Sequence, residues 1–264
     1  MSEASIQVSL RELDGGRVAD VTIDNSRRLN SLNGALMEQF VARFAELSAD
    51  ESLRAVVLTG AGGKAFVGGA DIDEMAGLDA GGARRFITRV HSCCAAVRDC
   101  PVPVIARIAG HVYGAGLELA ASCDLRVATE GSRFGMPEVR LGIPSVVEAA
   151  VLPSLVGWGR TRQMLYLGDT FDATQALAWG MVEEVASDAQ IDAVLDRWLE
   201  SLLACGPQSI RLQKKLIRRW EDLPLRDAVA AGIDTFAQAY ETDEPAEMMR
   251  RFREEHRARK TGHG

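Results

Sequence analysis

Two glutamates, Glu118 and Glu138, lie twenty residues apart in a stretch rich in glycine and small side chains. Glu118 falls just inside a helix predicted to open at Gly114-Ala115-Gly116, and Glu138 follows the next predicted strand. Two acids at these positions are able to converge on one pocket. Such a pair can transfer protons, because one carboxylate accepts a proton while the other carboxyl group donates one. The pair therefore indicates general acid and base chemistry.

A second glycine-rich turn, Phe66-Val67-Gly68-Gly69-Ala70-Asp71, precedes the first of these acids. Turns of small residues that lead into helices leave backbone N–H groups available to an oxyanion. With the two glutamates, the turn at Gly114 and the run Leu141-Gly142-Ile143-Pro144, the pattern resembles the enoyl-CoA hydratase/isomerase (crotonase) family. The resemblance covers nearly the whole chain, is strongest from Val57 to Gly142 and is weak after Cys205.

The resemblance implies a catalytic role for four residues. The N–H groups of Ala70 and Ala115 would hold the thioester oxygen as negative charge develops on it. Glu118 would position water for attack on the β-carbon of a 2-enoyl-CoA, and Glu138 would donate the α-carbon proton. The product would be a 3-hydroxyacyl-CoA. The sequence does not tell which of the two glutamates is protonated before substrate binds, because neighbouring acids titrate as a pair.

Binding residues are also implied by the resemblance, for an acyl-CoA thioester substrate. They are Arg27, Arg28, Gly68, Gly69, Asp71, Ile72, Gly114, Pro137, Gly142 and Ser145. The two arginines would lie near the CoA phosphates, and the alternative that they are ordinary surface residues stays open. Asp73 stands where a basic residue is common in the family, which removes one phosphate partner. Coenzyme A is part of the substrate, so no separate cofactor and no metal is expected.

One segment departs from the family pattern. Ser145-Val146-Val147-Glu148-Ala149-Ala150 replaces a glycine-rich run and should line the acyl pocket, where the valines would narrow it. Glu148 is a possible third acid. A position in the first turn of a helix favours an exposed glutamate that suits the helix dipole. If its carboxyl group pointed inward, proton shuttling between carbons would favour an enoyl-CoA isomerase.

Three functions therefore remain open. The first is hydration of a 2-enoyl-CoA, the second is double-bond isomerisation at the same site, and the third is a non-catalytic acyl-CoA-binding or structural subunit. A fold does not guarantee chemistry. The presence of both glutamates and both turns argues against the third, because a structural role requires neither.

Bulk composition excludes other classes. The chain has 264 residues, 47% hydrophobic and 25% charged, and a formal net charge of −7. This charge argues against nucleic acid or anionic lipid as a partner. No run approaches the length of a membrane span, and the N-terminus lacks the features of a signal peptide, which predicts a cytoplasmic protein. The five cysteines form no CxxC pair and are expected to be reduced.

The order of predicted elements indicates an α/β fold. A hairpin opens the chain, and then an amphipathic helix over residues 36–47, with Asn33 as its N-cap, precedes a buried strand at 55–58. Later strands are predicted at 104–106, 125–128 and 181–185, after which helical periodicity dominates. The resemblance implies a crotonase-like spiral of repeated ββα units.

Two domains are predicted from this organisation. Residues 1–200 would form the spiral core with the active site, and residues 201–264 a helical C-terminal oligomerisation subdomain. The resemblance implies a homotrimer or a dimer of trimers.

Overall fold

The computed structural model describes residues 4–261, with side chains as far as residue 257. Residues 1–3 and 262–264, which the two predicted domains include, lie outside the described range. The chain forms two compact units, of which one ends at Leu199 and the other begins at Glu200. Among the described helices, none combines the length and apolar character needed to cross a membrane.

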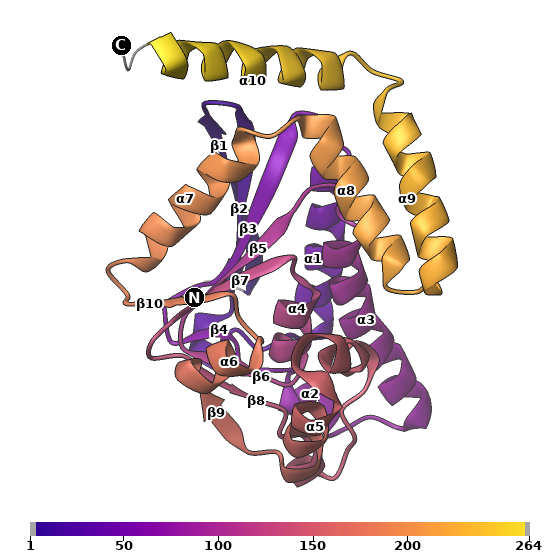
Figure 1. Ribbon diagram of the computed structural model, residues 1–264. Helices are drawn as coiled ribbons and strands as arrows, with labels where there is room; N and C mark the ends of the chain where they lie inside the picture. The colour runs from indigo at the N-terminus through magenta and orange to yellow at the C-terminus, as the bar shows by residue number, and fades with distance from the viewer. Residues whose placement is uncertain (1–3, 262–264) are drawn as a thin grey trace. The chain divides into compact units, whose positions relative to one another are not determined.

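Two sheets organise the first unit (Figure 1). In spatial order the larger sheet contains β1 (Ser5–Leu13), β2 (Gly16–Asp24), β3 (Leu53–Gly60), β5 (Val104–Ile108), β7 (Leu125–Thr129) and β10 (Glu184–Ala186). The smaller sheet contains β4 (Ala65–Val67), β6 (His111–Tyr113), β8 (Arg133–Gly135) and β9 (Thr170–Asp172). The pairs β1–β2 and β8–β9 are antiparallel, and all other pairs are parallel.

A repeat of two strands builds both sheets at once. The chain places β3, β5 and β7 in the larger sheet, and each is followed directly by β4, β6 or β8 in the smaller one. A helix or helical turn follows each second strand, so three successive turns of the chain give the ββα spiral. The α/β class and the spiral of repeated ββα units are confirmed.

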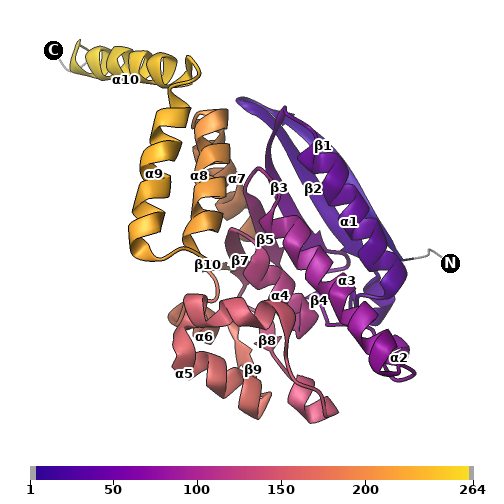
Figure 2. The same cartoon turned by 90° about the vertical axis from the view of Figure 1, so that its right-hand side faces the viewer.

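Helices cover these sheets. The helical segments of the first unit are η1 (Ser26–Arg28), α1 (Gly34–Ser48), α2 (Ile72–Met75), α3 (Ala80–Arg98), α4 (Ala115–Ser122), η2 (Glu138–Leu141), η3 (Val147–Val151), α5 (Leu152–Leu167) and α6 (Ala173–Trp179). Helices α1 and α3 lie side by side (Figures 1 and 2). Their apolar faces bury Phe40, Phe44 and Val90, among others, against the core.

The first predicted helix is confirmed with its cap. The side chain of Asn33 accepts a hydrogen bond from the N–H of Leu36, which satisfies one of the free donors at the start of α1. The apolar residues that recur with the helical period lie on the buried face of α1, where Leu36, Met37 and Phe40 are fully buried. The predicted buried strand at 55–58 lies inside β3 and is buried throughout.

The strand predicted at 181–185 is largely wrong. β10 covers only Glu184–Ala186. Gly180 adopts a left-handed conformation after α6, and the N–H of Met181 donates to the carbonyl of Ala176. Residue 181 therefore still closes the helix end, in the manner of a Schellman cap, before the chain reaches the sheet.

The second unit is helical. Helix α7 (Ile191–Leu203) passes into it, and α8 (Pro207–Trp220), α9 (Leu225–Ala239) and α10 (Glu244–Thr261) follow. Helices α8 and α9 pack side by side, and the indole N–H of Trp220 donates to the carbonyl of Ala228 (Figure 2). At the start of α8, the carboxylate of Glu244 accepts from the N–H groups of Gln208 and Ser209.

Candidate active site

The smaller sheet brings three loops to one edge. β4, β6 and β8 are parallel neighbours, so their carboxyl ends lie together. The turn Gly68–Asp71 follows β4, Gly114 follows β6, and Pro137 with Glu138 follows β8. Residues far apart in the sequence thus meet at a single edge, as the pairing of the two glutamates requires.

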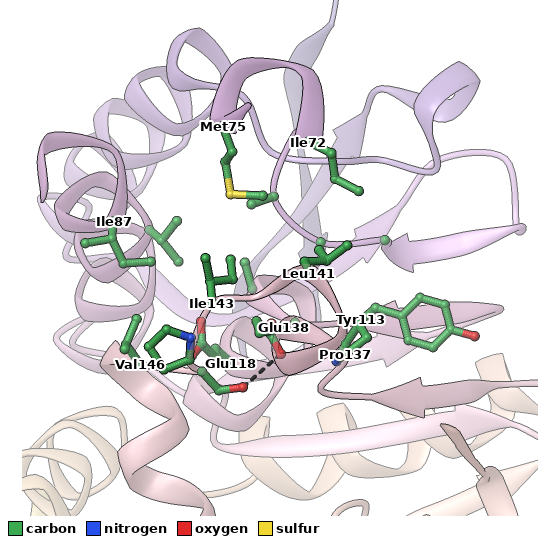
Figure 3. Close-up of a pocket in the computed structure, with 18 residues that line it drawn as sticks. Ile72, Met75, Ile87, Tyr113, Glu118, Pro137, Glu138, Leu141, Ile143 and Val146 are labelled. Atoms are coloured by element: carbon green, nitrogen blue, oxygen red, sulfur yellow. Dashed lines mark hydrogen bonds between the residues drawn. The ribbon is translucent and has the colours of Figure 1, made fainter. Parts of the chain in front are cut away.

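A cavity of about 110 Å³ lies at this edge (Figure 3). Most of its lining is apolar, and the two glutamates supply its carboxyl groups. The lining residues are Gly68, Gly69, Ala70, Ile72, Met75, Ile87, Val90, Tyr113, Gly114, Ala115, Glu118, Pro137, Glu138, Leu141, Ile143, Pro144, Ser145 and Val146. All four predicted catalytic residues are therefore brought together.

The two predicted amide donors are available to a ligand. An isolated parallel bridge pairs Leu32 with Ala70, through the carbonyl of Gly69 and the N–H of Asp71. Ala70 lies between Gly69 and Asp71, and in extended backbone its N–H points away from the strand edge that pairs with Leu32. Ala115 is the first residue of α4, where N–H groups have no partner within the helix. Within the described chain, neither N–H donates a hydrogen bond to another protein group.

Glu138 is held against the turn that carries one of these amides. Gly114 has φ of 51°, and a Cβ atom on it would lie 2.2 Å from Oε1 of Glu138. Only glycine permits both this backbone and this close approach. The hydroxyl of Ser145 donates to the other carboxylate oxygen, Oε2, at 2.8 Å (Figure 3). Glu138 is thus fixed on both sides and faces the cavity.

Glu118 is the more deeply buried acid. Its Oε1 accepts from the N–H of Ala149 at 3.1 Å. Burial, with the nearby charges of Glu138 and Glu148, raises the pKa of Glu118 to about 8. Burial also raises the pKa of Glu138. Because two charges in this apolar site are unfavourable, the pair retains one proton at neutral pH. A pair with one proton can donate and accept in the same step.

Glutamine at position 118 should stabilise the protein in alkaline solution. The pKa of Glu118 rises from 4.5 to about 8 on folding, so the unfolded state binds fewer protons between these values. Stability therefore falls as the pH rises through this window. Glu118→Gln keeps the acceptor for the Ala149 N–H and removes the charge. We expect a gain in unfolding free energy on the order of 2 kcal/mol at pH 8.

The measurement is urea unfolding of both proteins at several values between pH 5 and pH 8. The gain should shrink towards pH 5, where the folded acid is protonated and the pH lies only slightly above the unfolded pKa of 4.5. Glu130→Gln, the same chemical change at an exposed site, is the control. A gain that did not depend on pH would show that the charge of Glu118 is not the cause.

Several predicted binding residues lie away from the cavity lining. Asp71 caps α2 and is buried, and Gly142 ends η2 in a left-handed conformation. The guanidinium of Arg28 pairs with Asp71 at 3.0 Å and with Asp73 at 2.8 Å, whereas Arg27 is exposed. The remaining predicted binding residues, Gly68, Gly69, Ile72, Gly114, Pro137 and Ser145, line the cavity.

The prediction of an exposed side chain at Glu148, made from its place in the first turn of a helix, is wrong. The side chain of Glu148 is buried, and Val147, the residue before it, has φ of 40°. Even so, Glu148 is not among the residues that line the cavity. Its carboxylate instead contacts His91 of α3.

Some lining residues were not singled out from the sequence. Tyr113 is the last residue of β6, and its hydroxyl lies 3.0 Å from Nδ1 of His111. Ile87 and Val90 lie on α3, where an apolar helix face does not distinguish core from cavity. Among the described residues, no group of three His, Cys, Asp or Glu side chains is arranged to hold a metal ion.

Comparisons with known proteins agree with one another. A family model described as enoyl-CoA hydratase/isomerase matches residues 14–262. The chain is 32% identical to a short-chain-enoyl-CoA hydratase of Clostridium acetobutylicum, over 90% of this chain and 91% of the relative. It is 30% identical to a crotonyl-CoA hydratase of Syntrophomonas wolfei, over 92% and 94%.

A solved structure extends the likeness to the fold. The crystal structure of an enoyl-CoA hydratase from Bacillus anthracis superposes with a TM-score of 0.89 at 29% identity, and the match covers 95% of this chain and 96% of that one. Family model, sequence relatives and fold therefore agree over nearly the full length, and the chain belongs to the enoyl-CoA hydratase/isomerase family.

Proposed function

We propose that the protein is an enoyl-CoA hydratase that adds water across the 2,3 double bond of a short-chain enoyl-CoA. The observation that carries this proposal is the meeting of a buried and a partly buried carboxyl group, Glu118 and Glu138, with two unpaired backbone N–H groups in one apolar cavity. The relatives described as short-chain-enoyl-CoA hydratase and crotonyl-CoA hydratase support the reaction and the short acyl chain.

The two N–H groups polarise the substrate. We place the thioester oxygen between the amides of Ala70 and Ala115, where an enolate oxygen would be stabilised as it forms. A preorganised donor in a dry site stabilises such charge by about 3 kcal/mol. Electron withdrawal towards this oxygen makes the β-carbon open to attack by water and gives the α-carbon the character of a carbanion.

The two acids move the protons. Glu118 takes a proton from the water as its oxygen bonds to the β-carbon, and Glu138 gives a proton to the α-carbon. The proton that Glu118 holds at rest must first pass to Glu138. The bound water can relay it, because it accepts a proton from Glu118 and donates another to Glu138. One proton enters and one leaves the pair in each turnover, so the pair returns to its starting state.

Steady-state kinetics with crotonyl-CoA test the proposal. Loss of the conjugated enoyl absorbance with formation of 3-hydroxybutyryl-CoA would support it. A 3-enoyl-CoA should be tried in parallel, because conversion of this substrate to the 2-enoyl isomer without hydration would indicate an isomerase. Since Glu148 does not line the cavity, the structural argument for isomerisation through a third acid is absent.

Val146 should limit the length of the acyl chain. Val146 and Ile87 project at one end of the pocket, and Tyr113 lies at the other (Figure 3). Val146→Ala removes two methyl groups from this lining and should favour longer acyl groups. One methylene in an apolar pocket is worth roughly tenfold or more in discrimination. We therefore expect the ratio of kcat/KM for 2-octenoyl-CoA over crotonyl-CoA to rise about tenfold.

Val8→Ala is the matched control, because Val8 has a similar exposure, 36% against 39% for Val146, but lies on β1 away from the cavity. The ratio should be unchanged in this variant. If the ratio were also unchanged in Val146→Ala, Val146 would not contact the acyl chain.

Assembly, location and cofactors complete the proposal. We propose a cytoplasmic homotrimer or dimer of trimers that uses neither a metal nor a redox cofactor. A face of α9 that exposes Leu225, Val229, Ile233 and Phe236 supports self-association. The five cysteines form no CxxC pair, which supports a reducing compartment. The exposed Arg27 remains our candidate for a CoA phosphate.

A further inference from the structure

Glu148 is an unusual buried acid outside the cavity lining. One carboxylate oxygen, Oε1, lies 2.7 Å from Nδ1 of His91, whose own side chain is about half exposed. The other, Oε2, is buried and has no hydrogen-bond partner among the described residues. A buried carboxylate with one unsatisfied oxygen is costly. Such a group invites a functional explanation.

The neighbours of Glu148 connect it to the proposed chemistry. The next residue, Ala149, donates its N–H to Oε1 of Glu118 at 3.1 Å. The preceding residue, Val147, is held at φ of 40°, a conformation that a β-branched residue rarely adopts. This strain persists only where surrounding contacts impose it. The contact between His91 and Glu148 anchors the segment at this point.

Charge provides a second connection. The negative charge of Glu148 acts on two groups, Glu118 on α4 and the buried thiol of Cys94 on α3, and it raises the pKa of each. Glu138 acts on Glu118 in the same direction. Arg160 and Arg162 of α5 lie over the rings of Trp179 and Trp158. Among the described residues, the ionisable side chain that contacts the Glu148 carboxylate is His91.

We propose that His91 and Glu148 form a positioning pair for Glu118. The pair fixes the segment from Val147 to Ala149, and through the Ala149 N–H it fixes the carboxyl group of Glu118. The charge of Glu148 also favours the protonated form of Glu118, and His91 contacts the Glu148 carboxylate from the solvent side. The inference rests on the proposed hydratase function for its kinetic consequences, but not for its electrostatic ones.

The electrostatic part is tested on the protein without substrate. Glutamate labelled with ¹³C at the side-chain carboxyl gives a resonance for each acid, and the signal of Glu118 is identified by its loss in Glu118→Gln. In Glu148→Gln the titration midpoint of Glu118 should fall by about 0.5 units or more, because a like charge is removed. In His91→Gln the midpoint should stay at or above its wild-type value, because the carboxylate of Glu148 remains. Glu130→Gln, at an exposed site, should leave it unchanged.

The positioning part is tested by kinetics with crotonyl-CoA. Glu148→Ala should lower kcat about tenfold, and KM should change little because Glu148 does not line the cavity. Glu148→Gln keeps an acceptor for His91 and should recover most of the lost kcat, with an altered pH profile. Thermal unfolding of each variant separates these effects from loss of fold.

Two results would overturn the inference. One is an unchanged midpoint of Glu118 in Glu148→Gln, and the other is a wild-type kcat in folded Glu148→Ala. An inactive wild-type protein would instead contradict the proposed function. The titration would still report on the pair in that case, so the two failures are distinguishable.

Discussion

Glutamine at position 118 or 138 should lower kcat for the hydration of crotonyl-CoA by about 10³-fold. Each change keeps the size of the side chain and its acceptor oxygen, and removes only the ability to exchange a proton. Glu118 would keep its contact with the Ala149 N–H and Glu138 its contact with the Ser145 hydroxyl. KM should change little, because binding of the CoA portion does not depend on either acid.

The double variant gives the sharper result. Both acids act in one step, so their effects should not multiply, and Glu118→Gln/Glu138→Gln should be little slower than the worse single variant. Glu130→Gln serves as the control for a surface carboxylate. Activity near that of the wild type in the double variant would contradict the proposed mechanism.

Proline at position 115 should lower kcat by about 10²- to 10³-fold. Ala115 is the first residue of α4, a position at which proline fits the helix well. The substitution therefore removes the N–H that we assign to the thioester oxygen and leaves the helix able to form. Gly114, which precedes it, has the conformational freedom that the residue before a proline requires.

Ala115→Gly is the matched variant, because it changes the same position but keeps the N–H group. It should retain most of the activity. Circular dichroism and thermal unfolding would check that both variants fold. A folded Ala115→Pro protein with normal kcat would show that this amide does not stabilise the transition state.

Features that depend on local sequence were predictable. The cap of α1 rests on Asn33, three residues before its donor, and the burial of β3 follows from its continuous apolar run. Each of these two signals lies within a few residues of the feature that it specifies. The convergence of the two glutamates was expected from their positions and from the family resemblance, whereas the short strands β6 and β8 that bring them together were not predicted.

Features that depend on distant partners were not predictable. The pairing of Arg28 with Asp71 and Asp73 joins residues more than forty positions apart, and the contact of Glu148 with His91 spans 57 positions. The inward turn of Glu148 requires a positive φ at Val147, which the type of residue there disfavours. Tertiary packing imposes that conformation.

Isotopic analysis of the product tests the central claim most directly. Crotonyl-CoA would be incubated with the purified protein in D₂O enriched in ¹⁸O, and the product examined by mass spectrometry and NMR. The account predicts 3-hydroxybutyryl-CoA with ¹⁸O on the β-carbon and one deuterium on the α-carbon, formed by the wild type and not by Glu118→Gln/Glu138→Gln. Recovery of crotonyl-CoA without ¹⁸O, or equal product from the double variant, would contradict it.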